Sequence, residues 1–374
     1  MKILELCNFS AGIDGVFARV KEESIRLAER GHEIRIFSSN IVKGSDKTAP
    51  ETEKIGNIII KRFHTKKLGG ESYMTWNLGN KLEKAIIEFK PNVIIAHSYR
   101  HTHTVIGSKI AKKIGAKAFL VTHAPFARSG TRSFIANLYV NLIHDPFVGK
   151  ATLQRFDKII AITRWEIPYL LDLGVKKEKI KYIPNGIPEE FFTQKHHAKE
   201  QNKILFLGRI SPIKSIETII QALPLIGDKS IKLEIVGPAE QEYLKYIKSL
   251  IKELKLENRI VFSPAVYKIK EKIKKIDSAK IFILPSKSEG MPQSLIEAMS
   301  RKKIVIASDN LASKDLIVNG KNGYMFKIGS SKDLAQKINL ALERNQNKIK
   351  KTASSSVLQF SWSNIIKKIE SILS

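Results

Sequence analysis

Hydrophobic positions along the chain follow two recurring patterns, short apolar runs that predict buried strands and longer stripes with helical spacing. In the first half the two patterns alternate, and the short runs predict strands at 2–8, 33–38, 58–63, 93–97, 118–122, 158–161 and 181–183. The stripes between them predict helices at 16–30, 79–89, 104–114 and 166–173. Strands that alternate with helices imply a parallel sheet that is covered on both faces.

The alternation breaks at Pro184-Asn-Gly-Ile-Pro188, where two prolines around Asn-Gly predict a turn and a domain boundary. After the polar segment 194–202 it resumes, with strands predicted at 203–208, 232–236, 259–263, 281–285 and 305–307. Helices are expected at 215–223, 240–254, 268–276, 292–300, 332–344 and 363–373. We therefore predict an α/β protein of two doubly wound domains with a cleft between them: residues 1–187, a linker at 188–202, and residues 203–362. Ligands of such sheets bind at the carboxyl ends of the strands.

Composition narrows the class of protein. The 374 residues are 43% apolar, enough for a large core, and the single cysteine, Cys7, excludes a disulfide within the chain and fits a reducing compartment. The sequence shows no signal-peptide pattern and no apolar run of eighteen residues, so we expect a cytoplasmic protein without a membrane span. The net charge of +28 divides equally, +14 in residues 1–187 and +14 in 188–374, which excludes a basic tail. Such a charge favours anionic partners: nucleic acid, an acidic membrane surface or phosphorylated small molecules.

One long segment, Phe89–His144, contains no Asp or Glu. Solvated surfaces normally mix both signs of charge, so this segment predicts a positive field directed at an anionic partner. Its basic residues are Lys90, Arg100, Lys109, Lys112, Lys113, Lys117, Arg128 and Arg132.

Two loops carry candidate phosphate-binding groups. Gly12 and Gly15 lie between the first strand and the first helix, where glycines let a helix N-terminus approach a phosphate, although an ordinary tight turn explains them equally well. Arg209 follows the strand at 203–208 and Lys214 precedes the next helix. These two cations are expected to converge at the carboxyl end of that strand, where Arg supplies a planar fork for phosphate and Lys a point charge.

A denser cluster follows the strand at 281–285. Glu289 is expected in the loop and Glu297 eight residues later in a helix, where carboxylates accept hydrogen bonds from sugar hydroxyls and free N–H groups meet phosphate. Taken singly, Glu289 and Glu297 could be a helix-capping acid and a buried glutamate with satisfied hydrogen bonds. Those structural roles do not explain the whole set of residues in this cluster. Between them, Gly290 permits an unusual backbone and Pro292 suits a first helical turn. The remaining candidates of this cluster are Met291, Ser294 and Leu295.

Histidines mark the end of two strands. His123 ends the strand at 118–122 inside the acid-free segment, and we interpret it as a functional residue. His97, His101 and His103 lack a nearby carboxylate or cysteine, so we predict an exposed polar loop there and no metal site.

The order of these motifs resembles the retaining glycosyltransferases of family 4, which have the GT-B fold. The resemblance covers nearly the whole chain and rests on the glycine loop at Gly12–Gly15, Thr122-His123, Ile183-Pro-Asn-Gly-Ile187, Gly208-Arg209 with Lys214, and Glu289 with Glu297. It implies two Rossmann-like domains facing each other across a cleft, with the helix 363–374, preceded by Trp362, packing back on the N-terminal domain. The family often has Gly-Gly where this chain has Asp14-Gly15, Lys-Gly where it has Lys214-Ser215, and an aromatic residue at Met291.

The resemblance also implies roles. Arg209 and Lys214 would neutralise the diphosphate of a UDP- or GDP-hexose, Glu289 would bind the donor sugar, and Glu297 would hold the ribose. His123 and the glycine loop would approach the donor from the N-terminal domain. The base would meet backbone near Ser263–Val266. No cofactor is implied, and we expect a divalent metal to be dispensable if the two cations stabilise the leaving group.

The acceptor is less defined by the sequence. We expect a lipid-linked, membrane-associated or anionic glycan hydroxyl, with the enzyme peripheral on the cytoplasmic face of an acidic membrane. A GT-B nucleotide-sugar epimerase is the alternative activity. A nucleic-acid-binding protein ranks below both, because no nucleic-acid module is recognised and the charge is spread evenly.

Overall fold

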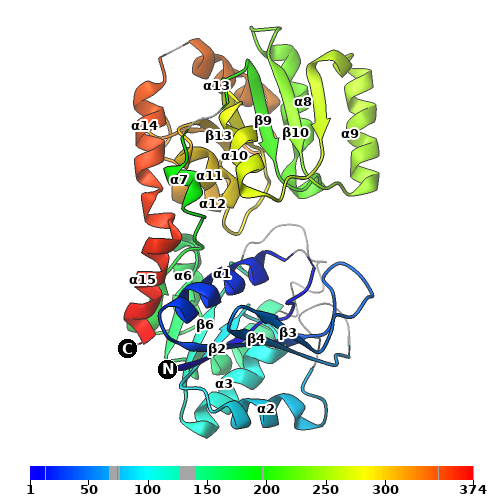
Figure 1. The fold of residues 1–374 in the computed structure, drawn as a ribbon. Helices are drawn as coiled ribbons and strands as arrows, with labels where there is room; N and C mark the ends of the chain where they lie inside the picture. Colours follow the sequence, from blue (N-terminus) through cyan, green and yellow to red (C-terminus); the bar gives the residue numbers. More distant parts are fainter. Residues whose placement is uncertain are drawn as a thin grey trace. The chain divides into compact units, whose positions relative to one another are not determined.

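The computed structural model describes residues 1–12, 14–66, 74, 76–126, 138, 140–195, 198–343 and 345–373. These residues form two compact units, which Figure 1 shows in colours that follow the sequence. Unit 1 holds the described residues of 1–126, 138–184 and 366–373, and unit 2 holds those of 185–365. Arg128 and Arg132 of the acid-free segment lie outside the described residues.

Unit 1 is built on a sheet with the strand order β3-β4-β2-β1-β5-β6-β7-β8, in which β3 alone runs antiparallel, to β4. The strands are β1 (Lys2–Leu6), β2 (Glu33–Ser39), β3 (Thr52–Ile55), β4 (Ile58–Phe63), β5 (Val93–His97), β6 (Lys117–Val121), β7 (Lys158–Ala161) and β8 (Ile180–Tyr182). The helices are α1 (Gly15–Glu29), α2 (Lys81–Phe89), α3 (Thr102–Ile114), α5 (Lys150–Gln154) and α6 (Ile167–Asp172), with the 3₁₀ turns η2 (Leu78–Asn80), η4 (Arg164–Glu166) and η5 (Lys177–Lys179) and the π-helical segment η3 (Val140–Gly149).

The register of the central strands decides which side chains meet at their carboxyl ends. All five residues of β5 are buried, as expected for a strand in a parallel sheet that is covered on both faces. Leu6 of β1 pairs with Ala96, and His97, the last residue of β5, pairs with Val121 of β6. The loops after β1, β5 and β6 therefore emerge side by side.

Unit 2 contains a parallel sheet with the order β11-β10-β9-β12-β13-β14. Its strands are β9 (Lys203–Leu207), β10 (Lys232–Val236), β11 (Ile260–Ser263), β12 (Ile281–Leu284), β13 (Ile304–Ser308) and β14 (Tyr324–Phe326). Its helices are α7 (Glu190–Thr193), α8 (Ile216–Ala222), α9 (Gln241–Glu253), α10 (Ile269–Asp277), α11 (Gln293–Ser300), α12 (Leu311–Leu316), α13 (Ser331–Glu343) and α14 (Asn347–Ser356), with 3₁₀ turns η6 (Pro212–Lys214), η7 (Leu223–Leu225), η8 (Glu257–Arg259) and η9 (Leu358–Phe360). The last helix, α15 (Trp362–Leu373), begins in unit 2 and ends in unit 1.

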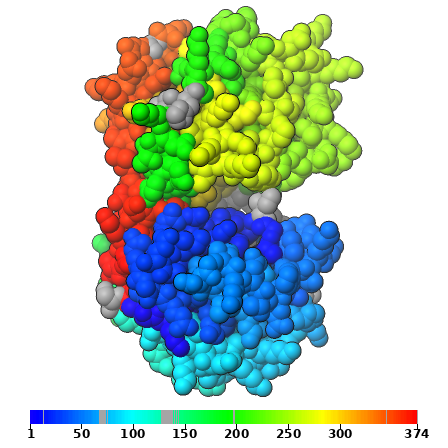
Figure 2. Space-filling view, in the orientation of Figure 1, coloured from blue at the N-terminus to red at the C-terminus, as the bar shows by residue number. Residues whose placement is uncertain are grey.

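Amphipathic helices cover this sheet. In α9 the buried side chains are Tyr243, Ile247 and Ile251, which lie four residues apart and so share one face. The opposite face of α9 is lysine-rich and lies at the outer surface of unit 2, as Figures 1 and 2 show. Among the described residues, no helix is both long and apolar enough to span a bilayer.

The prediction of two α/β domains with parallel sheets is confirmed. The elements that the pattern failed to predict are short or lack an apolar stripe. The strand β14 has three residues, and α14 has the sequence NKIKKTASSS, in which only Ala353 is buried. Neither segment contains the periodic apolar positions on which a helix or strand prediction depends.

Candidate active-site residues of the two units

In unit 2 the candidate residues gather where β9 and β12 end. A backbone hydrogen bond from Lys287 N to Ile213 O, 2.8 Å long, ties the loop after β12 to the turn that carries Lys214. The carbonyl oxygen of Ser286 accepts hydrogen bonds from Ser308 and Asn310, which anchors the start of the same loop. The loop that bears Glu289 is therefore fixed on both sides.

Lys214 and Glu289, predicted separately, form an ion pair. The distance from Nζ to Oε1 is 2.5 Å, and the two side chains are 18% and 11% exposed. Ser286 Oγ donates to the same carboxylate oxygen at 2.6 Å. Within the part of the chain that the structure describes, Oε2 of Glu289 has no hydrogen-bond partner, so it is available to accept from a ligand hydroxyl.

Arg209 does not contact Lys214. Its side chain is 61% exposed, and the nearest carboxylate oxygen, on Glu240, lies 3.5 Å away. The turn before Arg209 is fixed by a close approach of two strand ends: at Gly237, with φ +150°, a Cβ would stand 2.0 Å from the carbonyl oxygen of Gly208. The expected convergence of the two cations is thus not present as a direct contact, and each of them faces a different glutamate.

Glu297 is the second carboxylate of the predicted pair. It lies in α11 with its side chain 5% exposed, and Lys272 of α10 donates to Oε1 at 2.6 Å. Its other oxygen, Oε2, is buried and finds no donor among the described residues. A buried carboxylate oxygen without a donor is costly, which suits a group whose partner is a ligand hydroxyl.

The other residues of the cluster divide into surface and core. Gly290 and Pro292 lie between Glu289 and α11, with Pro292 directly before the first helical residue. Met291 Sδ accepts a hydrogen bond from Asn185 N at 3.2 Å. Ser294 is half-buried, whereas the side chain of Leu295 is fully buried in the core, so only the backbone of Leu295 can meet a ligand.

In unit 1 the glycine loop is shaped by a close contact with Lys43. Gly12 has φ +85°, and a Cβ there would stand 2.8 Å from Lys43 O, so a glycine is required. Gly15, the first residue of α1, is exposed and has no atom within 4 Å of its Cβ position, which leaves its backbone open to approach. Asp14, however, caps α1 by accepting from Phe17 N at 3.0 Å. Its carboxylate occupies the helix end at which a phosphate is expected.

His123 is held by a chain of buried hydrogen bonds. It has φ +59°, an uncommon conformation for a residue other than glycine, and its Nε2 lies 2.9 Å from His97 Nδ1. His97 Nε2 in turn lies 2.7 Å from Glu5 Oε2. The prediction of an exposed loop at His97–His103 is wrong: His97 and His103 are 0% and 1% exposed, because β5 is buried to its last residue and His103 faces the sheet from α3.

Burial determines the protonation states of Glu5, His97 and His123. It raises the pKa of Glu5 to about 8, lowers that of His97 to about 3, and holds the pKa of His123 well below its usual value. All three groups are therefore neutral at pH 7. A protonated Glu5 then donates to His97 Nε2, His97 Nδ1–H donates to His123 Nε2, and the proton of His123 stays on Nδ1.

Glu166, which was not among the residues predicted from the sequence, fixes the loop of His123. Glu166 Oε1 accepts from Thr122 Oγ1 at 2.6 Å and from Ala124 N at 2.8 Å. Oε2 accepts from Ile162 N and from both the N and Oγ1 of Thr163, at 2.9–3.0 Å. One carboxylate thus joins the loop after β6 to the loop after β7. Only the Thr163-x-x-Glu166 capping box indicates it in the sequence.

The described basic side chains of the acid-free segment lie at different places in unit 1. Arg100 is paired with Asp145, the first acid beyond the segment, and Lys113 lies 2.6 Å from Glu83. Lys117 is the first residue of β6 and Lys90 lies three residues before β5, so both lie at the amino ends of the strands, away from His123. These four described basic residues therefore do not form one positive face at the carboxyl edge of unit 1. Among the described residues, no three His, Cys, Asp or Glu side chains are grouped to hold a metal ion.

Comparison with known proteins finds two family models that match the chain. The family model for glycosyl transferases group 1 matches residues 188–355, and the model for glycosyltransferase family 4 matches residues 13–191. The crystal structure of Anabaena Alr3699/HepE in complex with UDP superimposes with a TM-score of 0.79 at 20% identity, covering 100% of this chain and 99% of that one.

Two curated relatives differ in their acceptors. The N-acetyl-alpha-D-glucosaminyl L-malate synthase of Bacillus anthracis is 23% identical over 389 residues, which cover 100% of this chain and 96% of the relative. The N,N'-diacetylbacillosaminyl-diphospho-undecaprenol alpha-1,3-N-acetylgalactosaminyltransferase of Campylobacter jejuni is 24% identical over 245 residues, 61% of this chain and 62% of the relative.

Proposed function

This chain belongs to the group 1 and family 4 glycosyltransferases and has the GT-B fold, and we propose that it is a retaining transferase that takes a hexose from a UDP- or GDP-sugar. The observation that carries the proposal is the Lys214–Glu289 pair at the carboxyl ends of β9 and β12. It offers an ammonium ion to a diphosphate and a free carboxylate oxygen to a sugar hydroxyl within one fixed loop cluster. The match to glycosyltransferase families disfavours the alternative of an epimerase.

The other residues take complementary roles in this proposal. Glu297, whose buried Oε2 lacks a donor, accepts from the ribose hydroxyls. Arg209, largely exposed, contributes the second cation for the diphosphate. The backbone of the segment Gly290–Leu295 approaches the phosphates at the start of α11, and the His123 loop and the glycine loop belong to the acceptor-side unit.

The chemical step follows from the leaving group. The bond between the anomeric carbon and the diphosphate oxygen breaks, and negative charge develops on that oxygen, where Lys214 and Arg209 stabilise it. The acceptor oxygen forms its bond to the anomeric carbon on the same face, and a diphosphate oxygen takes the proton of the acceptor hydroxyl. We propose that this step needs no divalent metal; loss of turnover with EDTA in folded enzyme would overturn that part.

A thermal-shift panel of UDP- and GDP-sugars tests the donor site. We expect one donor to stabilise the wild type, and the Glu289→Ala and Lys214→Ala variants to lose most of that stabilisation. The matched control is Lys287→Ala, in the same loop, whose side chain is 53% exposed and faces Glu217. Equal stabilisation of Glu289→Ala and wild type would refute the sugar contact, and no release of nucleoside diphosphate from any donor would refute the activity.

For the acceptor we propose a lipid-linked or anionic glycan at a membrane surface. The support comes from η3 and from Leu138, two residues before it: the apolar side chains of Leu138, Leu142, Phe147 and Val148 are 48%, 62%, 72% and 43% exposed. The carboxylate within this segment, Asp145, is turned inward to Arg100. Exposed apolar side chains without a free acid are typical of segments that lie in a membrane interface.

Vesicle flotation tests this acceptor side. We expect binding to vesicles that contain phosphatidylglycerol, weaker binding to pure phosphatidylcholine, and weakening by salt. The Leu142→Ser/Phe147→Ser variant should float several-fold less, whereas Leu225→Ser/Leu358→Ser, which removes two leucines of unit 2 that are 48% and 51% exposed, should float like wild type. Equal flotation of the two variants would exclude η3 as the membrane contact.

A further inference from the structure

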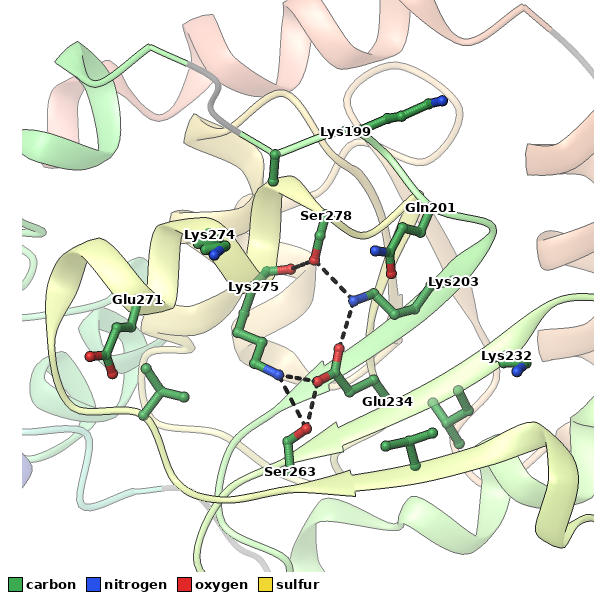
Figure 3. Close-up of a pocket in the computed structure, with 14 residues that line it drawn as sticks. Lys199, Gln201, Lys203, Lys232, Glu234, Ser263, Glu271, Lys274, Lys275 and Ser278 are labelled. Carbon is green, nitrogen blue, oxygen red and sulfur yellow. Dashed lines mark hydrogen bonds and ion pairs between the residues drawn. The ribbon is translucent and has the colours of Figure 1, made fainter.

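Unit 2 contains a cavity of about 790 Å³ that is lined by none of the charged residues proposed for the donor, Arg209, Lys214, Glu289 and Glu297. Its lining does include Ser263 and Val266, the ends of the segment that is expected to meet the donor's base. It lies against the face of the sheet formed by β9, β10 and β11, beside α10, and Figure 3 shows its polar lining. Its lower wall comes from the strands, through Lys203, Lys232 and Glu234, and its other wall from α10, through Lys274 and Lys275.

The inner part of the cavity is a fixed polar network. Glu234, 7% exposed, accepts from Lys203 Nζ at 2.7 Å, from Ser263 Oγ at 2.6 Å and from Lys275 Nζ. Burial alone would raise the pKa of Glu234, but these three hydrogen bonds outweigh it and lower the pKa to about 2. Ser278 Oγ completes the network by accepting from Lys203 at 2.9 Å. The inner surface therefore holds two ammonium groups in place around one carboxylate.

Lysines at the rim of the cavity add positive charge. Lys199, Lys232 and Lys274 are exposed, and within the described part of the chain none of them forms an ion pair. The other carboxylate of the lining, Glu271, lies 3.7 Å from Lys268 outside the cavity. Five lysines and two glutamates line the cavity, so its walls carry a net charge of +3.

Shape and charge together define the chemistry of a ligand. Leu233, Val261 and Val266 give the cavity apolar surface beside the lysines, and its volume admits a molecule the size of a nucleotide or a sugar bisphosphate. Several ammonium groups around one space match an anion with three or more negative charges, since each phosphate oxygen can accept from a different lysine. A single carboxylate would leave most of this charge unbalanced.

We infer that this cavity is a second ligand site, lined by none of the charged residues proposed for the donor's diphosphate and sugar, which binds a small molecule carrying two or more phosphate groups. The lysines of the rim would contact the outer phosphate oxygens, and the network around Glu234 would hold Lys203 and Lys275 in position for the inner ones. A nucleotide and a phosphorylated sugar share this chemistry.

Calorimetric titration of the full-length protein with inorganic pyrophosphate tests the inference. Because the donor site is also proposed to bind a diphosphate, the titration is made in the Arg209→Ala/Lys214→Ala background, where only the cavity should bind. Adding Lys232→Ala/Lys274→Ala should weaken pyrophosphate binding by roughly tenfold or more, since two charge-assisted contacts are lost. Both lysines are exposed, so their removal should leave the circular dichroism spectrum and the melting temperature unchanged.

The matched control is Lys248→Ala/Lys252→Ala, which removes the same charge from the exposed face of α9. Pyrophosphate binding that survives the donor-site substitutions, survives the control and is lost with Lys232 and Lys274 supports the site. Titration with a nucleoside diphosphate and with a sugar bisphosphate then identifies the source of the phosphates by the tighter of the two. Absence of binding once Arg209 and Lys214 are replaced, or equal weakening by the control pair, would overturn the inference.

Discussion

Replacement of Glu166 by glutamine tests how the loop of His123 is held. The substitution is nearly isosteric but exchanges one acceptor oxygen for an NH₂ donor. If the NH₂ group took the place of Oε2, it would face the N–H groups of both Ile162 and Thr163. The cheaper orientation places it at Oε1, where the Thr122 hydroxyl can rotate to accept and only the N–H of Ala124 loses its acceptor.

The magnitude follows from that count. One buried N–H without a partner costs about 1–3 kcal/mol, which corresponds to roughly a 5- to 150-fold change in an equilibrium constant. We therefore expect Glu166→Gln to accelerate hydrogen exchange of the Ala124 amide by about that factor. Since Ala124 has φ +54° beside His123 at +59°, the loop has no regular structure to hold it once this bond is lost.

Hydrogen exchange followed by mass spectrometry measures this effect in peptides that span 122–126 and 160–166. The control is Glu88→Gln, which changes an exposed carboxylate in α2 of the same unit. We also expect Glu166→Gln to lower kcat while donor-induced thermal stabilisation is retained, because unit 2 is unchanged. Exchange at Ala124 within twofold of wild type would refute the idea that this carboxylate holds the loop.

Three further outcomes follow from buried groups. Glu5 keeps its proton up to about pH 8 when folded but loses it near 4.5 when unfolded, whereas His97 and His123 stay neutral when folded and take up protons below about pH 6.5 when unfolded. The histidines oppose the effect of Glu5 below about pH 6.5, so the stability of unit 1 should fall between about pH 6.5 and 8, by at most about 1.4 kcal/mol per unit, and Glu5→Gln should flatten that slope in urea titrations. Gly237→Ala should cost on the order of 3 kcal/mol in urea unfolding, because its Cβ would stand 2.0 Å from Gly208 O; a loss below 1 kcal/mol would contradict this contact. Arg301→Ala should cost about 3–5 kcal/mol, because the guanidinium pairs with buried Asp277 at 2.7 Å, and an unchanged unfolding midpoint would show that this pair is not stabilising.

The fold and the edge at which the site lies could be predicted from the sequence, because strand and helix periods alternate and glycines, prolines and acids follow the strands. The position of Lys214 and Glu289 beyond the carboxyl ends of strands could be predicted, but their ion pair could not, because the strand order that places β9 beside β12 comes from the structure. The pattern of residues along the chain does not show which side chains pair over long separations, such as the 75 residues between Lys214 and Glu289. It therefore failed for Arg209, which lies against Glu240.

The buried network of unit 1 was missed for a different reason. Polar residues are normally exposed, so the spacing of His97 and His103 suggested a loop, whereas both side chains are buried at the end of a fully buried strand and in the helix that covers it. Glu5 lies in an otherwise apolar strand, where one acid looks like an interruption. Only the three-dimensional register places it 2.7 Å from His97 and so reveals that the interruption has a partner.

The net charge of +28 has no single function, but in unit 2 part of it follows one rule. Three buried or nearly buried carboxylates each hold a lysine: Glu289 holds Lys214, Glu297 holds Lys272, and Glu234 holds Lys275. A lysine held in this way keeps its ammonium group fixed while N–H donors remain for another acceptor, two in Lys214 and Lys272 and one in Lys275, which also donates to Ser263 Oγ. An incoming anion therefore needs little reorganisation. Two of these lysines belong to α10, which also supplies Lys274 to the cavity. The proposed ribose contact and the proposed phosphate cavity thus depend on the same helix.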